Sequence, residues 1–184
     1  MSEQIVQRVK GEKITDRLVS LWDRDARPIR KGKLGKPNEF GYVDQLCEVT
    51  ANTKPGARGF ILPPSTQVGN PSENTLLPET VSELQNLEIT LREVMLDGGF
   101  MPTPTNTALE NVADEVYITG RQESGSRRTR RRRQRYRTGA EGRISHLKRG
   151  YGVRRSRLKG DEGHRIWGGW AAFTYNAETY TTLG

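Results

Sequence analysis

The residue whose type and setting point most clearly to chemistry is Glu141, the single acid in the stretch RTGAEGRISHLKRG at 137–150. Ile144, Leu147 and Tyr151 recur at helical spacing, so this stretch is predicted to be a helix that places Glu141 on a different face from the apolar stripe. A carboxylate among arginines and lysines stays ionised and can hold a cation. The alternative is a surface glutamate that neutralises part of an arginine cluster.

A second acid, Asp97, ends the predicted strand REVMLD at 92–97 and is followed by Gly98 and Gly99. The C-terminal end of a strand is a favoured place for a functional acid in α/β folds, and glycines allow a close approach of the backbone. The alternative is an aspartate that only serves the turn.

The segments that must position these acids alternate between strand and helix patterns, which predicts an α/β fold. The predicted strands are 17–22, 39–50, 59–62, 92–97 and 115–119, and the predicted helices begin at Asn74 or Thr75, span 103–114 and 137–150, and end the chain at 163–183. The second and third strands are expected to form an antiparallel hairpin, since 52–58 supplies turn residues.

The positive charge is concentrated in one part of the chain. The net charge is +8 and the pI about 9.9, but residues 121–165 hold 17 arginines and lysines against 4 acids, whereas the rest holds 13 against 18. Such a distribution is typical of a face that binds a polyanion. The arginine block at 127–137 is expected to be a helix or an ordered arm on nucleic acid, and the basic loop at 23–37 either a phosphate contact or a solvated loop.

Composition excludes several other classes of protein. With 33% hydrophobic residues, 20 glycines and 9 prolines, we expect a thin core and long loops. The single Cys47 excludes an internal disulfide framework, and two distant histidines argue against a zinc site. No apolar run approaches the ~20 residues of a membrane span, and we expect a soluble cytoplasmic protein. Trp167 and Trp170 are candidates for the core, with base stacking as the alternative.

Several of these stretches, in order, resemble insertion-sequence transposases of the DDE type. They are IRKGKLGKPNEFGY, GNPSENTLLPETV, EVMLDGGF, GRQESGSRRT, RYRTGAEGRISHLKRGYGVRRSRLKGDEG and WGGWAAFTYN, and they cover nearly the whole chain from about Leu18 onward. The resemblance implies a catalytic domain built on an RNase H-like mixed sheet flanked by helices. It implies that the enzyme cuts and rejoins double-stranded DNA at the ends of a mobile element. It also implies Mg²⁺ or Mn²⁺ as cofactor, a location at the nucleoid of a prokaryotic cell, and allows a homodimer.

In such enzymes two aspartates and a glutamate bind two divalent metals for phosphodiester chemistry. The resemblance makes Asp97 the second aspartate and Glu141 the glutamate, both catalytic and both metal ligands. Relatives surround the glutamate with Y-x2-R-x3-E-x6-K, which Arg137 and Lys148 match, whereas Gln134 stands where tyrosine is expected. The expected DNA-binding residues are Arg127, Arg128, Arg130, Arg131, Arg132, Arg133, Arg137 and Lys148.

The first aspartate of the family is the main departure from this pattern. Relatives carry it in a strand upstream of the KGKLGKP block, and that strand is not found here. The chain is therefore expected to be the C-terminal part of a transposase, with 1–16 a remnant of an upstream helical segment and 17–184 a partial catalytic domain. Asp23 or Asp25 is the alternative source of the acid. Because that strand is central in an RNase H-like sheet, its neighbours should lack a partner unless 17–22 fills the place.

Two other functions are consistent with the basic charge. The first is a DNA-binding remnant without catalysis, which competes with an intact transposase for DNA. The second is a structural RNA-binding protein of ribosomal type, which leaves the LDGGF motif and the aromatic C-terminal segment without an explanation.

Overall fold

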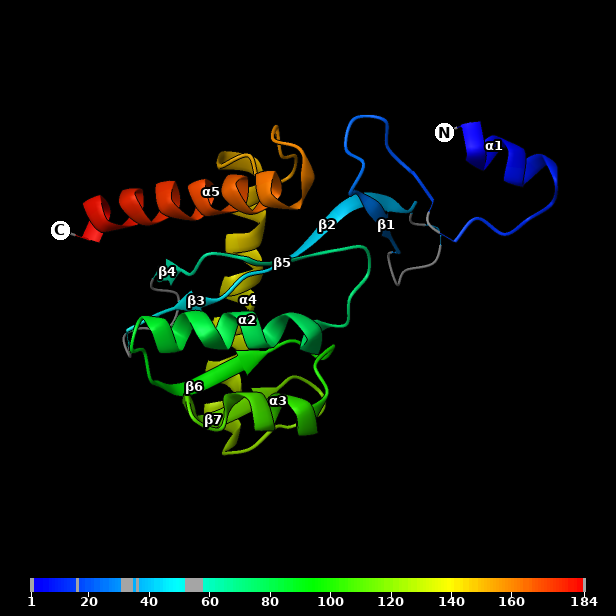
Figure 1. Cartoon of the computed structure of the whole chain (residues 1–184). Helices are drawn as coiled ribbons and strands as arrows, with labels where there is room; N and C mark the ends of the chain where they lie inside the picture. Colours follow the sequence, from blue (N-terminus) through cyan, green and yellow to red (C-terminus); the bar gives the residue numbers. More distant parts are fainter. Residues whose placement is uncertain (1, 16, 31–34, 36, 52–57, 184) are drawn as a thin grey trace.

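The computed structural model describes residues 2–15, 17–30, 35, 37–51 and 58–183, and these form a mixed α/β fold (Figure 1). In chain order the elements are α1 Ser2–Val9, β1 Arg27–Ile29, β2 Glu39–Gln45, β3 Glu48–Val49, β4 Phe60–Ile61, β5 Ser65–Val68, α2 Glu73–Asn86, β6 Leu91–Leu96, α3 Pro102–Leu109, β7 Ala113–Ile118, α4 Arg127–Gly150 and α5 Gly160–Leu183. Helix α1 buries none of its residues and lies apart from the other elements (Figure 1). None of the helices described is long and apolar enough to span a membrane.

The strands described form three small sheets. In the first, β2 lies between β1 and β5 and is antiparallel to both. In the second, β3 pairs with β4, also antiparallel. Because β2 leads into β3 and β4 into β5, these strands confirm the predicted hairpin. Most of its predicted turn, 52–57, lies outside the described residues.

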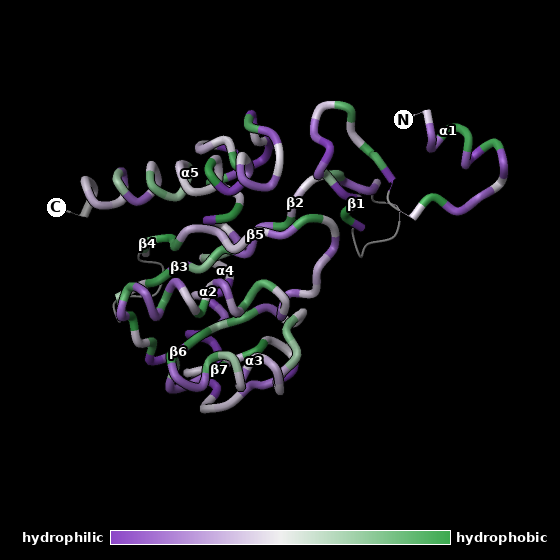
Figure 2. Tube along the Cα trace, in the orientation of Figure 1, coloured by the Kyte–Doolittle hydropathy of each residue, from purple (hydrophilic) through white to green (hydrophobic). Residues whose placement is uncertain are grey.

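Strands β6 and β7 form the third sheet and are parallel, with Leu96 opposite Ile118. Helix α3 connects them, since parallel neighbours need a crossover connection. In Figure 1 α2 lies above this pair, α3 lies in front of it and α4 passes behind it. The core between these layers includes the buried Leu84, Leu109 and Ile118, and Figure 2 shows the hydrophobic colour that runs along β6. This packing fixes the C-terminal end of β6, where Asp97 follows.

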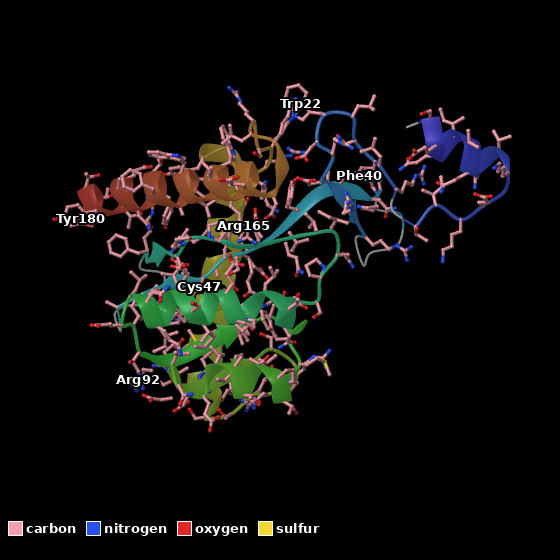
Figure 3. All side chains as sticks on the ribbon, in the orientation of Figure 1. Trp22, Phe40, Cys47, Arg92, Arg165 and Tyr180 are labelled. Atoms are coloured by element: carbon pink, nitrogen blue, oxygen red, sulfur yellow. The ribbon has the colours of Figure 1, made fainter. Side chains whose placement is uncertain are left out.

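Helix α5 closes the other side of the molecule. Its Tyr175 and Ala172 pack against Leu147 of α4 and Ile61 of β4 in a second buried cluster. The Asn176 side chain also bonds the backbone of Ile61 in both directions, at 2.8 Å each. Near the start of α5, labelled in Figure 3, the guanidinium of Arg165 contacts carboxylates of α2 and α5 and a carbonyl of β5.

The predicted strand at 17–22 is wrong. Its residues adopt no strand, because the Ser20 hydroxyl accepts the backbone N–H groups of Trp22 and Asp23 and so holds a local turn in place of a sheet ladder. The short β1 pairs with β2 instead, within the predicted basic loop. Residues 31–34 and 36 of that loop lie outside the described part of the chain.

Strand β5 was not predicted from the sequence. The other elements follow their predictions with shifted ends. The helix expected at 103–114 ends at Leu109, and the chain turns through the buried Val112 into β7, which begins at Ala113. The arginine block and the Glu141 stretch form one continuous helix, α4, which Ser126 caps by accepting the N–H of Thr129 at 3.2 Å.

Helix α4 buries Arg133 and Leu147 but is otherwise half-buried or exposed. The Arg133 side chain is 2% exposed, and its guanidinium donates to Glu93 at 3.1 Å, to Glu115, and to the carbonyl of Ser124 at 2.9 Å. These bonds join α4 to β6, to β7 and to its own preceding loop. A buried arginine is stable only when its charge is compensated in this way.

Replacing Arg133 with alanine should therefore lower the free energy of unfolding by about 2–3 kcal/mol, because it removes a buried charge partner of Glu93 and the donor to Ser124. Urea unfolding followed by far-ultraviolet circular dichroism measures this loss. The matched control is Arg128→Ala, an exposed arginine of the same helix, which should change stability by less than about 0.5 kcal/mol. Equal losses for the two variants would contradict a structural role for Arg133.

Candidate carboxylate–arginine site

The two acids singled out in the sequence meet on one arginine. Arg137 donates from Nη2 to Asp97 Oδ1 at 3.0 Å, and the same nitrogen lies 2.8 Å from Glu141 Oε1. The Asp97 and Glu141 side chains are 61% and 57% exposed, so the pair opens to solvent, whereas Arg137 is 23% exposed. The structure thus places two carboxylates, from a strand end and from a helix, within reach of a common cation.

A tight turn after β6 holds Asp97 in place. The Asp97 carboxylate accepts the backbone N–H of Gly98 at 2.7 Å, and the backbone carbonyl of Asp97 accepts the N–H of Phe100 at 3.3 Å. Arg121 donates to the carbonyl of Gly98 at 2.6 Å. A Cβ at Gly98 would lie 2.9 Å from the carbonyl oxygen of Thr119, so the turn requires glycine here. The Gly-Gly pair therefore has the backbone role that its sequence indicates.

Glu73 is a third acid near this pair that sequence reasoning missed. It lies in the first turn of α2, and its carboxylate rests against Gly99, where it leaves no room for a Cβ. Partial burial, together with the negative charge of Asp97, raises the pKa of Glu73 above its usual value. An acid in the first turn of a helix is favoured by the helix dipole, so the sequence alone explains Glu73 without a site.

The exposed part of α4 carries most of the predicted DNA contacts. Arg127, Arg128, Arg130, Arg131 and Lys148 are exposed. No ion pair among the described residues involves these five. They are therefore free to meet phosphates.

Two other predicted DNA contacts of α4 are paired with acids of β6 and β7. Arg133 is buried and bonded to Glu93 and Glu115, and Arg132 shares Glu93, with its own side chain 34% exposed. A guanidinium that is already paired on the inside of the fold cannot also reach a DNA backbone. Arg133 therefore has an internal structural role, in place of the DNA contact predicted for it.

The alternative sources of a third catalytic acid, Asp23 and Asp25, have other partners. Asp23 accepts the hydroxyl of Tyr42 at 3.0 Å and the N–H of Gly160 at 3.2 Å. Asp25 also lies beside Gly160. Partial burial and the hydrogen bond to Asp23 raise the pKa of Tyr42. Both aspartates thus belong to the junction of β2 and α5, and neither shares a hydrogen-bond or ion-pair partner with Asp97 or Glu141.

The donor set suits one divalent cation better than two. Mg²⁺ prefers carboxylate oxygens in octahedral geometry and retains several waters, so two carboxylates suffice for a single ion. In this structure the Arg137 guanidinium lies between Asp97 and Glu141 and pairs with both. The described residues contain no group of three or more acids, histidines or cysteines that would complete a larger metal site.

Because the pKa of Glu73 is raised, replacing this residue should change the stability of the protein by an amount that depends on pH. The pKa of Glu73 in the folded state is raised above 4.5, so the folded protein holds this proton more tightly than the unfolded chain does. The protonated side chain therefore contributes stability at low pH, and this contribution is lost as the pH rises through the raised pKa. Glu73→Gln should therefore stabilise the protein relative to wild type at about pH 7 and have little effect at about pH 4.

Urea unfolding at both pH values measures this difference. Glu83→Gln, near the other end of α2, is the matched control for exchanging an acid for an amide on this helix. A stabilisation by Glu73→Gln that is equally large at the two pH values would contradict the proton linkage.

Comparison with known proteins assigns no family to this chain. The chain matches no protein-family model, no curated protein and no solved structure. Its activity is therefore inferred from its motifs and from the arrangement of its side chains.

Proposed function

We propose that this chain takes part in DNA strand cleavage and transfer of the DDE transposase type, with Asp97 and Glu141 as two of the catalytic carboxylates. The observation that carries the proposal is their convergence on Arg137. The two acids come from residues far apart in sequence, and each was singled out by a different local motif. Arg137 and Glu141 are spaced i,i+4 on α4, where ion pairs are common, so the contact that brings Asp97 to the same guanidinium is what supports the proposal.

The arrangement of the sheets supports the same proposal. The antiparallel β1–β2–β5 sheet and the parallel β6–β7 pair are separate, and none of the strands described pairs with the other edge of β6. Neighbours without a partner are what an RNase H-like sheet without its central strand would leave. Cys47, Val49 and Leu62, in and beside the β3–β4 hairpin, nevertheless pack on the core that contains β6, so the hairpin and the parallel pair share one core.

In this proposal each charged residue has a distinct role. Asp97 and Glu141 would hold the divalent cation, which supplies activation of the attacking oxygen and stabilisation of the leaving oxygen. Arg137 would turn from the carboxylates to a phosphate oxygen of the strand being cut. The exposed arginines of α4 and Lys148 would bind the DNA backbone, since phosphate contacts position a duplex without reading its sequence.

A nicking assay on DNA that carries the ends of a mobile element tests these roles. With Mn²⁺ or Mg²⁺ present, the wild-type chain should nick the substrate, whereas Asp97→Ala and Glu141→Ala should reduce nicking to background, because each removes a metal ligand. Glu110→Ala, an exposed acid at the end of α3, is the matched control and should retain wild-type nicking. Nicking that survives both the Asp97 and Glu141 substitutions would rule out the proposed roles.

A second function, DNA binding without cleavage, is favoured by one observation. The described residues bring only Asp97 and Glu141 onto Arg137, and no group of three acids completes the family's triad. In this alternative Arg137 neutralises the two acids permanently, and α4 competes for DNA with an intact enzyme. The same assay distinguishes the two functions, because the alternative gives salt-dependent binding to the substrate with no nicking in either metal.

A further inference from the structure

A pocket of ≈ 890 Å³ lies away from the Asp97 pair, where the end of α4, the following loop and the first half of α5 meet Trp22. Its volume falls within the roughly 300–1,000 Å³ of typical ligand sites. Neither Asp97, Glu141 nor Arg137 lines it. In Figure 3, Trp22 lies beyond the N-terminal part of α5, and Tyr180 marks the opposite end of that helix.

The walls of this pocket are aromatic. Trp22, Trp167 and Trp170 all line it, as does Tyr151. Trp22 and Trp170 are each 64% exposed, an unusual state for the side chain that gains most from burial. Trp170 is steadied by an edge-on contact with Phe173, at 5.7 Å between ring centroids. Two large, positioned and solvent-facing rings are a platform on which another flat group can stack.

Trp167 fixes the shape of the pocket. Its indole N–H donates to the carbonyl of Gly152 at 3.0 Å. Gly152 has φ +70°, and a Cβ there would lie 3.2 Å from the Trp167 ring, so both the turn and the close approach require glycine. The loop is thereby tied to α5, and the pocket exists before any ligand binds.

The charge of the pocket is entirely positive. Arg154, Arg155 and Arg157 line it and are exposed, and no aspartate or glutamate is among the lining residues. No ion pair among the described residues involves these three arginines. Lys159 adds a further cation, 3.8 Å from the centroid of the Trp22 ring. Unpaired guanidinium groups around an aromatic floor favour a ligand that is both flat and anionic.

We propose that this pocket binds an unpaired base of a single-stranded nucleic acid. The base stacks on Trp22 or Trp170, and the adjoining phosphates contact Arg154, Arg155 and Arg157. Aromatic platforms combined with a cationic groove are how proteins hold single strands, because every base has a π-face and every linkage a phosphate. The same chemistry would also accept a free nucleotide. The site is distinct from the duplex-binding face of α4, and it holds whether or not the chain cleaves DNA.

Intrinsic tryptophan fluorescence tests the proposal directly, because the chain has three tryptophans and all three line the pocket. Without metal, an oligothymidylate of about 12 nucleotides should quench the fluorescence, since a site of this kind spans roughly 4–16 nucleotides. An abasic strand of the same length, which keeps the phosphates, should bind at least about tenfold more weakly. A blunt duplex should not reproduce the quenching.

Three outcomes would overturn the proposal. Equal affinity for the abasic strand would show that phosphates alone are bound. Equal quenching by the duplex would show that no unpaired base is needed. Binding of thymidine monophosphate as tightly as the strand would assign the pocket to a free nucleotide. Because no cleavage is measured, none of these results depends on the nicking activity.

Substitution of one exposed ring separates stacking from charge. Trp170→Ala should weaken binding of a labelled oligothymidylate about tenfold, as measured by fluorescence anisotropy, because it removes a stacking surface. Tyr180→Ala is the matched control, an exposed aromatic residue of the same helix that does not line the pocket. Circular dichroism checks that both variants are folded. Unchanged affinity of the Trp170→Ala protein would overturn a stacking role for this ring.

Discussion

Arginine–carboxylate pairs hold α4 against the rest of the protein, and the candidate site depends on them. This helix buries Leu147 but few other apolar side chains, so hydrophobic burial alone does not fix its position. The pairs join Arg133 to Glu93, Arg137 to Asp97 and Arg143 to Glu48. Since surface ion pairs contribute little one by one, the buried Arg133 pair must carry most of the positional specificity.

This mode of docking divides the charges of α4 into two sets. Arginines on the inner side are neutralised by acids of β6 and β7, whereas Arg127, Arg128, Arg130 and Arg131 on the outer side are exposed and take part in no ion pair among the described residues. Arg137 lies at the boundary, half-buried and shared between Asp97 and Glu141. One helix thus packs against the fold through some of its arginines and presents Glu141 and unpaired arginines to solvent. The pocket beyond its C-terminal end extends the same basic surface toward Trp22 and Trp170.

Local periodicity and turn chemistry were enough to predict the hairpin, α2, β6, the second half of α4 and α5, because each has a clear apolar pattern or cap. For the first half of α4 the sequence left open a helix or an ordered arm on nucleic acid. The segment 17–22 has a strand-like composition, but Ser20 bonds its own backbone and prevents pairing. Burial of Arg133 could not be predicted from a block of nearly identical arginines, since it depends on Glu93, 40 residues away. The position of Glu73 beside Gly99 likewise depends on how α2 packs over the end of β6. Asp97 and Glu141 were singled out from the sequence as candidate site residues because each lies in a distinctive motif.

We propose that Asp97 and Glu141 form one cation site, at which the Arg137 guanidinium lies in this structure. Titration of Mn²⁺, with the free ion followed by electron paramagnetic resonance, tests it in wild type and in Arg137→Gln. Removing the guanidinium leaves two uncompensated carboxylates, so the variant should bind Mn²⁺ roughly tenfold more tightly. Adding Asp97→Asn to Arg137→Gln should abolish that gain. Equal Mn²⁺ affinity in wild type and Arg137→Gln would contradict the account.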